Sequence, residues 1–337
     1  MFKRSGSGRG SGGRLFRSSS EVPTVPSSPA SASLLDCFNP FKRDDEDKDD
    51  SGSSLEPPSD TSNGSEMSTS KSKSTLNSQY AFVRNLGKGA SGVVFEAQNK
   101  VSHKKVAIKE INIVKGVDVD KILREVQLVA NLNHHVNVVS IYHTWIEESP
   151  SPVTQSLYFS MELCQEGTLR DWLDEHALNE RVPNELLEFF KQLLRGVGHI
   201  HQAGLIHRDI KPANTMMSKE GSDTYKLKLG DFGIITKADS KPHTLNLGTP
   251  IYMSPEVEED ALYTNKVDIF ALGMILIELH QDLSDLSDRR EVLGEAKNGV
   301  IKPFTYKELA QKMLRHQHEE RPEASQILDC LENQSGK

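Results

Sequence analysis

The chain has 337 residues, a formal net charge of −8 and a hydrophobic content of 36%. These values argue against a basic nucleic-acid-binding domain and favour a globular unit accompanied by additional chain. The three cysteines, Cys37, Cys164 and Cys330, are widely spaced and form no CxxC group. We therefore expect neither a disulfide framework nor a zinc site, and we predict a reducing, cytoplasmic compartment.

Residues 1–77 are dominated by Ser, Gly and Pro, and they contain almost no aromatic or β-branched runs. This composition cannot bury enough apolar surface to offset the entropy of ordering, so we predict a disordered tail. The segment FKRSGSGRGSGGRLFR is basic and RDDEDKDD is a short acidic block. Solvated chain is the simplest interpretation; an Arg-Gly-rich RNA contact, a phosphoregulated segment and an organelle transit peptide are alternatives.

From Tyr80 to Leu331 apolar residues recur at regular spacing, so we predict one folded domain over residues 78–334. Its longest apolar run, VDIFALGMILIEL, contains acidic residues and is shorter than a bilayer-spanning helix. We therefore expect no membrane span.

The first predicted elements are β-strands that flank a glycine-rich turn. The segment NLGKGASGVVFEAQN places Gly87, Gly89 and Gly92 at a hairpin turn, and KKVAIKEINI alternates as a third strand. Backbone amides without a Cβ could close over phosphates at this turn. A Rossmann site would require a helix directly after the glycines, whereas VVFEA continues as a strand. A glycine-rich hairpin without a ligand is the alternative.

The next predicted element is a helix, because VDKILREVQLVANLNHH has apolar residues at helical spacing over 119–132. Glu125 lies at the edge of this apolar stripe, and Lys109 lies in the preceding strand. The two side chains could pair and hold the α- and β-phosphates of a nucleotide. The alternative is that both are ordinary solvated side chains.

Farther along the chain, HRDIKPAN precedes the run YKLKLG, which ends at DFG. Asp209 and Asn214 are five residues apart, and Asp231 follows a β-like run. This set predicts side chains that handle magnesium and a proton.

The motifs GKGASGV, VAIK, Glu125, HRDIKPAN, DFG and SPE, in this order and spacing, resemble the eukaryotic protein kinase family over residues 80–331. The resemblance implies an α+β, bilobal fold with a small β-rich N-lobe and a larger helical C-lobe. It also implies that ATP and Mg²⁺ bind between the lobes.

The resemblance assigns roles to individual residues of this sequence. Asp209 would orient the acceptor hydroxyl, and Lys211 would reach the γ-phosphate. Asn214 and Asp231 would hold Mg²⁺, while Lys109 paired with Glu125 would fix the nucleotide. The residues expected to contact ATP lie on the glycine loop, the third strand and the hinge, where Met161 would be the gatekeeper: Leu86, Gly87, Lys88, Gly89, Ala90, Ser91, Gly92, Val93, Val94, Ala107, Lys109, Met161, Glu162 and Cys164.

Further residues are similar to those of serine/threonine kinases. Lys211 in HRDxKxxN and Thr249 in GTPIYMSPE favour serine/threonine over tyrosine specificity. Glu256 and Arg321 would form a buried ion pair, and Asp268 would tie the catalytic loop to a buried helix. In NTMM and SPE the sequence departs from the commoner family pattern, without loss of a charge that catalysis needs.

The segment NLNHHVNVVSIYHTWIEES, with Trp145, resembles the kinases of the translation initiation factor 2 alpha subunit. The segments ELCQEGTLRDWL, LGDFGIITKADSKPHTLNLGTPIYMSPE and SDRREVLGEAKNGVIKPF resemble the same subfamily, most nearly its double-stranded-RNA-activated branch. The subfamily's long small-lobe insert has shrunk to about PSPVTQ. We recognise no nucleic-acid-binding domain, and the dimerisation motif of the subfamily is not recognisable, so dimerisation is left open. The segment from Arg290 to Gly299 would be the helix on which the substrate docks.

We expect Thr244 to be an activating phosphosite, because a phosphate there would bring negative charge toward Arg208 and order the activation segment. Thr249 is a weaker candidate, since it would brace Asp209, and Ser240 is farther away.

Two classes of function follow. The first is an active serine/threonine kinase that phosphorylates the initiation factor and lowers translation under stress, or a kinase of another protein. The second is a pseudokinase scaffold. Intact Lys109, Asp209, Asn214 and Asp231 favour the active enzyme.

Overall fold

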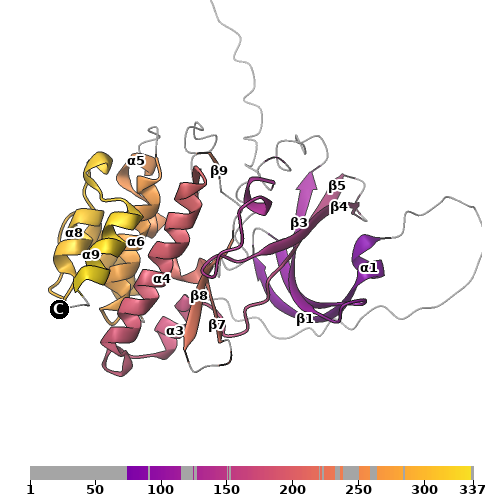
Figure 1. Cartoon of the computed structure of the whole chain (residues 1–337), viewed down its shortest axis with the longest axis horizontal. Coiled ribbons are helices and arrows are strands. Elements are labelled where there is room, and N and C mark those ends of the chain that lie inside the picture. The colour runs from indigo at the N-terminus through magenta and orange to yellow at the C-terminus, as the bar shows by residue number, and fades with distance from the viewer. Residues whose placement is uncertain are drawn as a thin grey trace, which may run out of the picture. The chain divides into compact units, whose positions relative to one another are not determined.

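The structure is a computed structural model, and it describes residues 74–89, 92–114, 124, 127–149, 151, 153–219, 221, 224–231, 236–237, 250–258, 264–283 and 285–334. In this part of the chain the long strands come first and most helices follow; the exceptions are one short N-terminal helix and the helical residues 124 and 127–130, which lie between the third and fourth strands (Figure 1).

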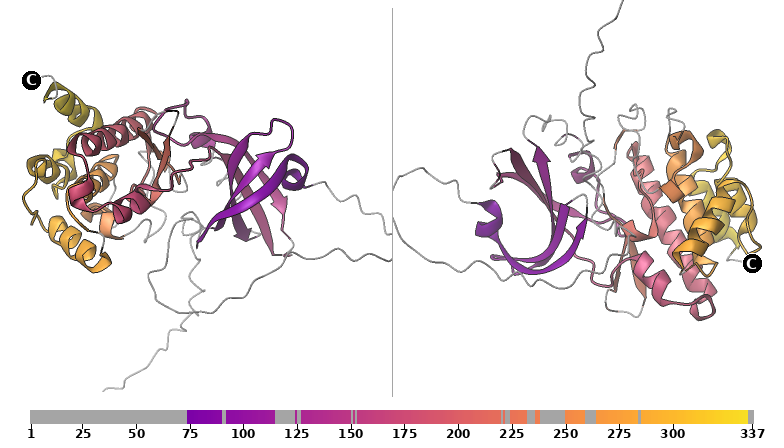
Figure 2. Two further views of the ribbon diagram at one scale, coloured as in Figure 1. Left: turned by 90° about the horizontal axis from the view of Figure 1, so that it is seen from below. Right: turned by 180° about the vertical axis from the view of Figure 1, so that it is seen from behind.

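The long strands form one antiparallel sheet in the order β1-β2-β3-β5-β4, which Figure 2 shows as a single curved layer. Their bounds are β1 Tyr80–Gly89, β2 Gly92–Asn99, β3 Lys105–Val114, β4 Ile141–Glu148 and β5 Thr154–Met161. The predicted glycine hairpin and third strand are confirmed. Gly92 has φ +127°, and a Cβ there would lie 2.0 Å from the Glu110 carbonyl oxygen, so this position requires glycine.

A short helix, α1 (Thr75–Gln79), covers one end of the sheet. Its first turn is capped by Ser74 Oγ, which accepts from the Asn77 amide at 3.2 Å. Leu76 packs against the aromatic cluster of the sheet, in which Trp145 stacks on Tyr80. The described fold thus includes residues at the end of the segment predicted as tail; the domain bounds themselves stay a prediction.

More of the described residues lie in α-helices than in β-strands. Besides α1, these helices are α3 Leu169–Glu175, α4 Pro183–Gln202, α5 Pro255–Glu258, α6 Lys266–Leu279, α7 Leu286–Lys297, α8 Lys307–Met313 and α9 Ala324–Gln334. Every residue of α6 after Lys266 is buried, because α4, α7 and α8 pack around it. The apolar run of the sequence is therefore the central core helix, and among the described residues no helix is long and apolar enough to cross a bilayer.

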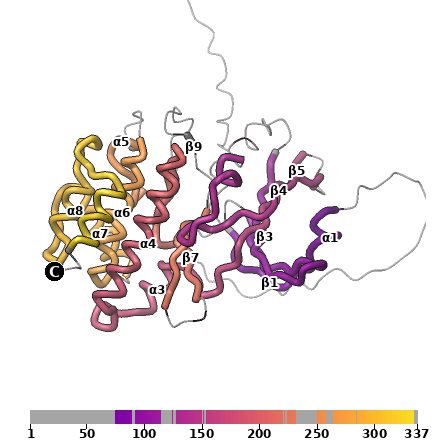
Figure 3. The backbone as a smooth tube through the Cα atoms, in the orientation of Figure 1, coloured from indigo at the N-terminus to yellow at the C-terminus, as the bar shows by residue number. Residues whose placement is uncertain are grey.

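Two small two-stranded sheets frame the loops of interest. Strand β6 (Leu205–Ile206), which pairs with β9 (Thr236–Lys237), precedes the loop of residues 207–211, and this loop runs into the 3-10 turn of Pro212–Asn214. The pair β7 (Thr215–Lys219) and β8 (Tyr225–Leu229) follows that turn and leads to Asp231. Figure 3 traces this part of the backbone beside α4, against which β8 packs.

The predicted α+β fold, with a β-rich part and a larger helical part, is confirmed. The predicted helix over 119–132 is only partly described: residues 124 and 127–130 are helical. Glu125 lies outside the described residues.

Candidate active site

The loop between β6 and β7 brings three predicted site residues into contact. Lys211 Nζ donates to Asp209 Oδ2 at 2.9 Å, and Asn214 Nδ2 donates to the same oxygen at 2.8 Å. Asp209, Lys211 and Asn214 are all buried. Two donors therefore fix one carboxylate oxygen of Asp209, and no described residue donates to its Oδ1.

Helix α6 holds the backbone of this loop through hydrogen bonds to Asp268. Asp268 accepts from the amides of His207 and Arg208 at 2.8 Å each, and from His201 Nε2 at 2.8 Å. Arg208 has φ +71°, a left-handed conformation that non-glycine residues rarely adopt. Burial opposes ionisation of Asp268, but the hydrogen bond and charge of His201 outweigh it and lower its pKa. The predicted tie between Asp268 and the loop is thus present.

Asp231 lies next to the same loop, because the Gly230 amide donates to the Asn214 carbonyl at 2.9 Å. Its Oδ1 accepts from Lys109 Nζ at 2.8 Å. Burial raises the pKa of Asp231, and the charge of Lys109 opposes this shift. The structure thus brings Lys109 to Asp231; its expected partner Glu125 is outside the described residues.

Two buried oxygens of this cluster fit a divalent cation. Among the described residues, Asn214 Oδ1 and Asp231 Oδ2 have no hydrogen-bond donor. Buried acceptors without donors are costly, and amide and carboxylate oxygens are the ligands that Mg²⁺ prefers. The residues present therefore fit the Mg²⁺ site predicted for Asn214 and Asp231.

Several predicted nucleotide contacts share one face of the sheet. Val94 lies opposite Lys109, and Ala107 lies opposite Met161. Residues directly paired or two apart in a strand point to the same side, so these four side chains line one surface. Val93 lies on the other face, where it packs against the aromatic cluster. Its side chain is therefore not brought to this surface, because the pleat of β2 turns it away.

The turn between β1 and β2 carries the remaining loop residues. Leu86 and Gly87 are half-buried and Lys88 is exposed. Gly89 pairs with Gly92 across the turn. Ala90 and Ser91 lie outside the described residues.

The hinge follows β5, where Glu162 and Cys164 are half-buried. The Glu162 amide donates to the Ser140 carbonyl at 2.9 Å. Lys228 Nζ contacts Glu162 Oε1 at 3.0 Å, and the Ser140 amide donates to Oε2 at 3.3 Å. Lys228 was missed by the sequence reasoning. Its signal was a lysine inside the buried strand that leads to DFG.

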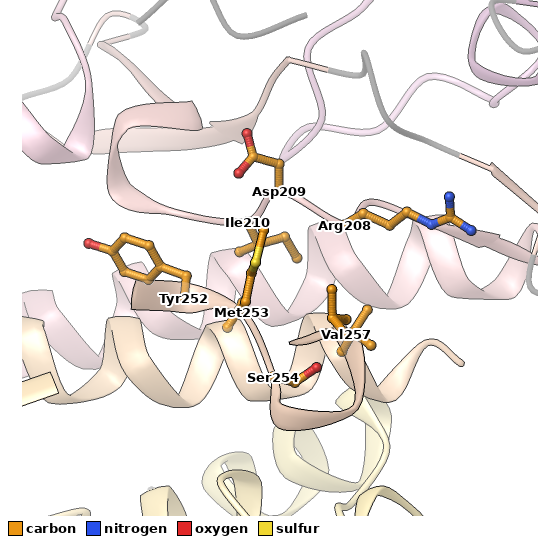
Figure 4. Close-up of a pocket in the computed structure, with 9 residues that line it drawn as sticks. Arg208, Asp209, Ile210, Tyr252, Met253, Ser254 and Val257 are labelled. Atoms are coloured by element: carbon orange, nitrogen blue, oxygen red, sulfur yellow. The ribbon is translucent and has the colours of Figure 1, made fainter. Parts of the chain in front are cut away.

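Figure 4 shows a pocket beside this loop, with Asp209 above Met253 and Ser254 below it, Tyr252 to the left and Arg208 to the right. Residues of the loop 207–211 and of the segment 250–254 line this pocket together. Of the predicted activation-segment residues, Ser240, Thr244 and Thr249 lie outside the described residues.

The predicted ion pair behind this segment is present. Arg321 donates to both oxygens of Glu256, at 2.6 and 2.8 Å, and its side chain is fully buried. Burial opposes ionisation of Glu256, but the hydrogen bonds and charge of Arg321 lower its pKa.

Three features are typical of nucleotide-dependent phosphotransferases: a sheet with a glycine-rich turn, an Asn–Asp pair whose buried oxygens fit a cation, and an aspartate that accepts from a lysine. The sequence matches the family model described as protein kinase domain over residues 80–331. The chain therefore belongs to the protein kinase family, whose members use ATP and Mg²⁺ to phosphorylate protein hydroxyl groups.

Similar proteins include several named kinases. The chain is 36% identical to the interferon-induced, double-stranded RNA-activated protein kinase of Rattus norvegicus over 74% of its own length and 51% of that protein. It is 39% identical to the eukaryotic translation initiation factor 2-alpha kinase pek-1 of Caenorhabditis elegans over 43% of the chain and 15% of that protein. It is 35% identical to the serine/threonine-protein kinase sid1 of Schizosaccharomyces pombe over 59% of the chain and 40% of that protein. The chain thus spans about half the length of the first of these relatives.

Proposed function

We propose that this chain is an active serine/threonine kinase that transfers the γ-phosphate of ATP to the alpha subunit of translation initiation factor 2, and so lowers translation under stress. The observation that carries the proposal is the buried cluster in which Lys211 and Asn214 hold Asp209 beside the Lys109–Asp231 pair. A scaffold without activity would not need these four charges buried together, because burying charge is costly.

The roles of the chain's own residues follow from this geometry. Lys211 and Asn214 fix Asp209 Oδ2, so Oδ1 is left to accept the proton of the acceptor hydroxyl. Lys109 would hold the phosphates of ATP on the sheet face that it shares with Val94 and Ala107. Asn214 and Asp231 would hold Mg²⁺. When bound, this ion neutralises negative charge that develops on the transferred phosphoryl group.

The choice of substrate rests on similarity. The C. elegans relative is named as a kinase of the initiation factor's alpha subunit, and the sequence motifs around Trp145 point the same way. The S. pombe kinase matches at similar identity, which favours a kinase of another protein as the second candidate. The cytoplasmic location stays a prediction, which rests on the widely spaced cysteines, and dimerisation stays open.

The test is a transfer assay with the purified chain, the initiation factor's alpha subunit, ATP and Mg²⁺. We expect phosphoserine or phosphothreonine on the factor. Asp209→Asn should lower the transfer rate by about 10²- to 10⁴-fold, as for a positioned acid/base group, while ATP still binds. Transfer to casein without transfer to the factor would favour the second candidate. Near-normal transfer by Asp209→Asn in a single-turnover assay would show that the role of Asp209 is wrong.

A further inference from the structure

A glutamate that the transfer mechanism does not use holds the first described residues of the chain on the sheet. Glu147, in β4, is half-buried. Its Oε1 accepts from the Leu76 amide at 2.7 Å and from Trp145 Nε1 at 2.8 Å. Burial opposes ionisation of Glu147, but hydrogen bonds from the Ser74 side chain and the Leu76 amide outweigh it and lower its pKa. One charged carboxylate therefore ties α1 to the sheet.

Helix α1, which lies beside β1 in Figure 1, covers part of the aromatic cluster of the sheet. Leu76 packs against this cluster, in which Trp145 stacks on Tyr80 at 5.6 Å. The ring of Phe82, which is 62% exposed, lies 5.8 Å from that of Phe95 in the same cluster. Release of α1 would therefore enlarge an apolar surface that is already partly open.

Ser74 lies where α1 meets this carboxylate. Its Oγ accepts from the Asn77 amide at 3.2 Å, and its side chain hydrogen-bonds to Glu147. Ser74 is half-buried, so part of its surface is open to solvent. In the sequence it follows Lys71 and Lys73, and such basic residues complement a kinase with an acidic acceptor groove. The side chain is thus accessible and lies in a suitable sequence.

A phosphate on Ser74 would change this contact in two ways. The proton that Ser74 donates to Glu147 would be lost, and about −1.5 to −2 charges would be placed beside the carboxylate. The start of a helix favours anions, which opposes this repulsion. That opposing effect is small here, because α1 has 5 residues and Glu147 already accepts from the Leu76 amide. Repulsion therefore outweighs it, and the docked position of α1 becomes unfavourable.

We propose that Ser74 is a phosphorylation site, and that a phosphate there releases α1 from Glu147 and uncovers the aromatic face of the sheet. In the transfer, Ser74 Oγ bonds to the γ-phosphorus of ATP, the bond from that phosphorus to the β,γ-bridging oxygen breaks, and ADP leaves. The hydroxyl proton passes to the general base of the kinase. The inference requires ATP and a protein kinase, but it does not depend on the substrate proposed for this chain.

The first test asks whether Ser74 accepts a phosphate. The acceptor is the isotope-labelled full chain with Asp209→Asn, which should lack its own transfer activity. The kinase is either the wild-type chain or, separately, the catalytic subunit of cAMP-dependent protein kinase, each with ATP and Mg²⁺. Phosphopeptide mapping should find phosphate on Ser74 in at least one reaction, and Ser74→Ala should remove it. No phosphate on Ser74 in either reaction overturns the proposal, while transfer to casein, measured in parallel, tests the proposed activity of the chain by itself.

The second test introduces phosphoserine at position 74 of the full chain by suppression of an amber codon. We expect the melting temperature to fall by about 4–8 °C, the shift that corresponds to loss of the α1 contacts. Acrylamide quenching of tryptophan fluorescence should rise, because Trp145 becomes exposed, whereas Trp172 is 5% exposed in the helical core. In Glu147→Gln, whose amide oxygen can still accept from Leu76, the same phosphate should lower the melting temperature by no more than about 2 °C.

Phosphoserine at position 325 is the matched control. Ser325 is exposed in the first turn of α9, so a phosphate there adds the same charge at the start of a helix that does not contact Glu147. The melting temperature and the quenching should stay nearly unchanged.

The proposal is overturned if phosphoserine at position 74 leaves the melting temperature and the quenching at wild-type values, or if its effect is equally large in Glu147→Gln. If Glu147→Gln shows no cooperative thermal transition, salt decides instead. Sodium chloride at about 1 M screens the repulsion, so the difference in melting temperature between the modified and unmodified chains should shrink. An unchanged difference overturns the proposal.

Discussion

Asp268 offers the sharpest test of how the fold holds the catalytic loop. It accepts three hydrogen bonds, two from the amides of His207 and Arg208 and one from His201, all at 2.8 Å. In Asp268→Asn one oxygen can still accept, but the amide nitrogen would face a donor. Oδ2 accepts the bonds from His201 and His207, and Oδ1 accepts the one from Arg208, so the variant loses at least one bond. Hydrogen bonds to a charged group contribute about 1.5–3 kcal/mol each, so we expect the free energy of unfolding to fall by at least about 1.5–3 kcal/mol.

The same substitution should affect catalysis. The left-handed conformation of Arg208 costs about 1–3 kcal/mol, and the hydrogen bond from its amide to Asp268 helps to hold it. When these contacts weaken, the loop should relax and displace the adjacent Asp209. A displacement of about 1 Å can cost about 10²-fold in rate, so we expect kcat to fall by roughly that factor.

Guanidinium chloride unfolding and kcat at saturating ATP test this expectation, with Asp329→Asn as the control. Asp329 is exposed on α9, so its substitution should change the free energy of unfolding by no more than about 0.5 kcal/mol. The lowered pKa of Asp268 means that its contribution is fully present above about pH 4, the unfolded value, and is lost as pH falls through the folded pKa. The Asp268→Asn variant should not show this loss of stability at low pH. A loss of stability below about 1 kcal/mol together with an unchanged kcat would refute the reasoning.

Three further predictions concern other parts of the chain. Thr244→Ala should strongly lower activity and spare ATP affinity, because a phosphate there would add about −1.5 to −2 charges opposite Arg208; wild-type activity, or no phosphate on mapped peptides, would exclude it. Deletion of residues 1–73 should leave the melting temperature nearly unchanged. Deletion of residues 1–79 also removes the packing of Leu76 and should lower the melting temperature by about 4–8 °C; equal melting temperatures for the two deletion variants would contradict this. Burial lowers the pKa of His280, so its contribution to the free energy of unfolding should be full above about pH 6.5 and should decline as pH falls toward the folded pKa. In His280→Gln this free energy should depend less on pH over the same range, and an identical dependence in the variant and the wild type would disprove the prediction.

The sequence by itself determined the fold class and most of the candidate site. The glycine hairpin follows from Gly87, Gly89 and Gly92 within an alternating pattern, and the structure adds that Gly92 has no room for a Cβ. Asp209, Lys211 and Asn214 lie within six consecutive residues, so the short loop that carries them keeps their side chains close together. Residues so close in sequence are also held close in space by the backbone, so a short motif is enough to predict that they meet.

Only the tertiary structure decided which distant side chains meet. Arg170 and Glu278 are separated by 108 positions, and nothing in their local sequence marks them as partners. Lys228 likewise contacts the hinge through Glu162 because β8 and the hinge pack together. The pleat of β2 placed Val94 with Lys109 and turned Val93 away, a choice that depends on register. Contacts of this kind arise from the packing of whole elements, so they depend on chain segments that no single motif contains.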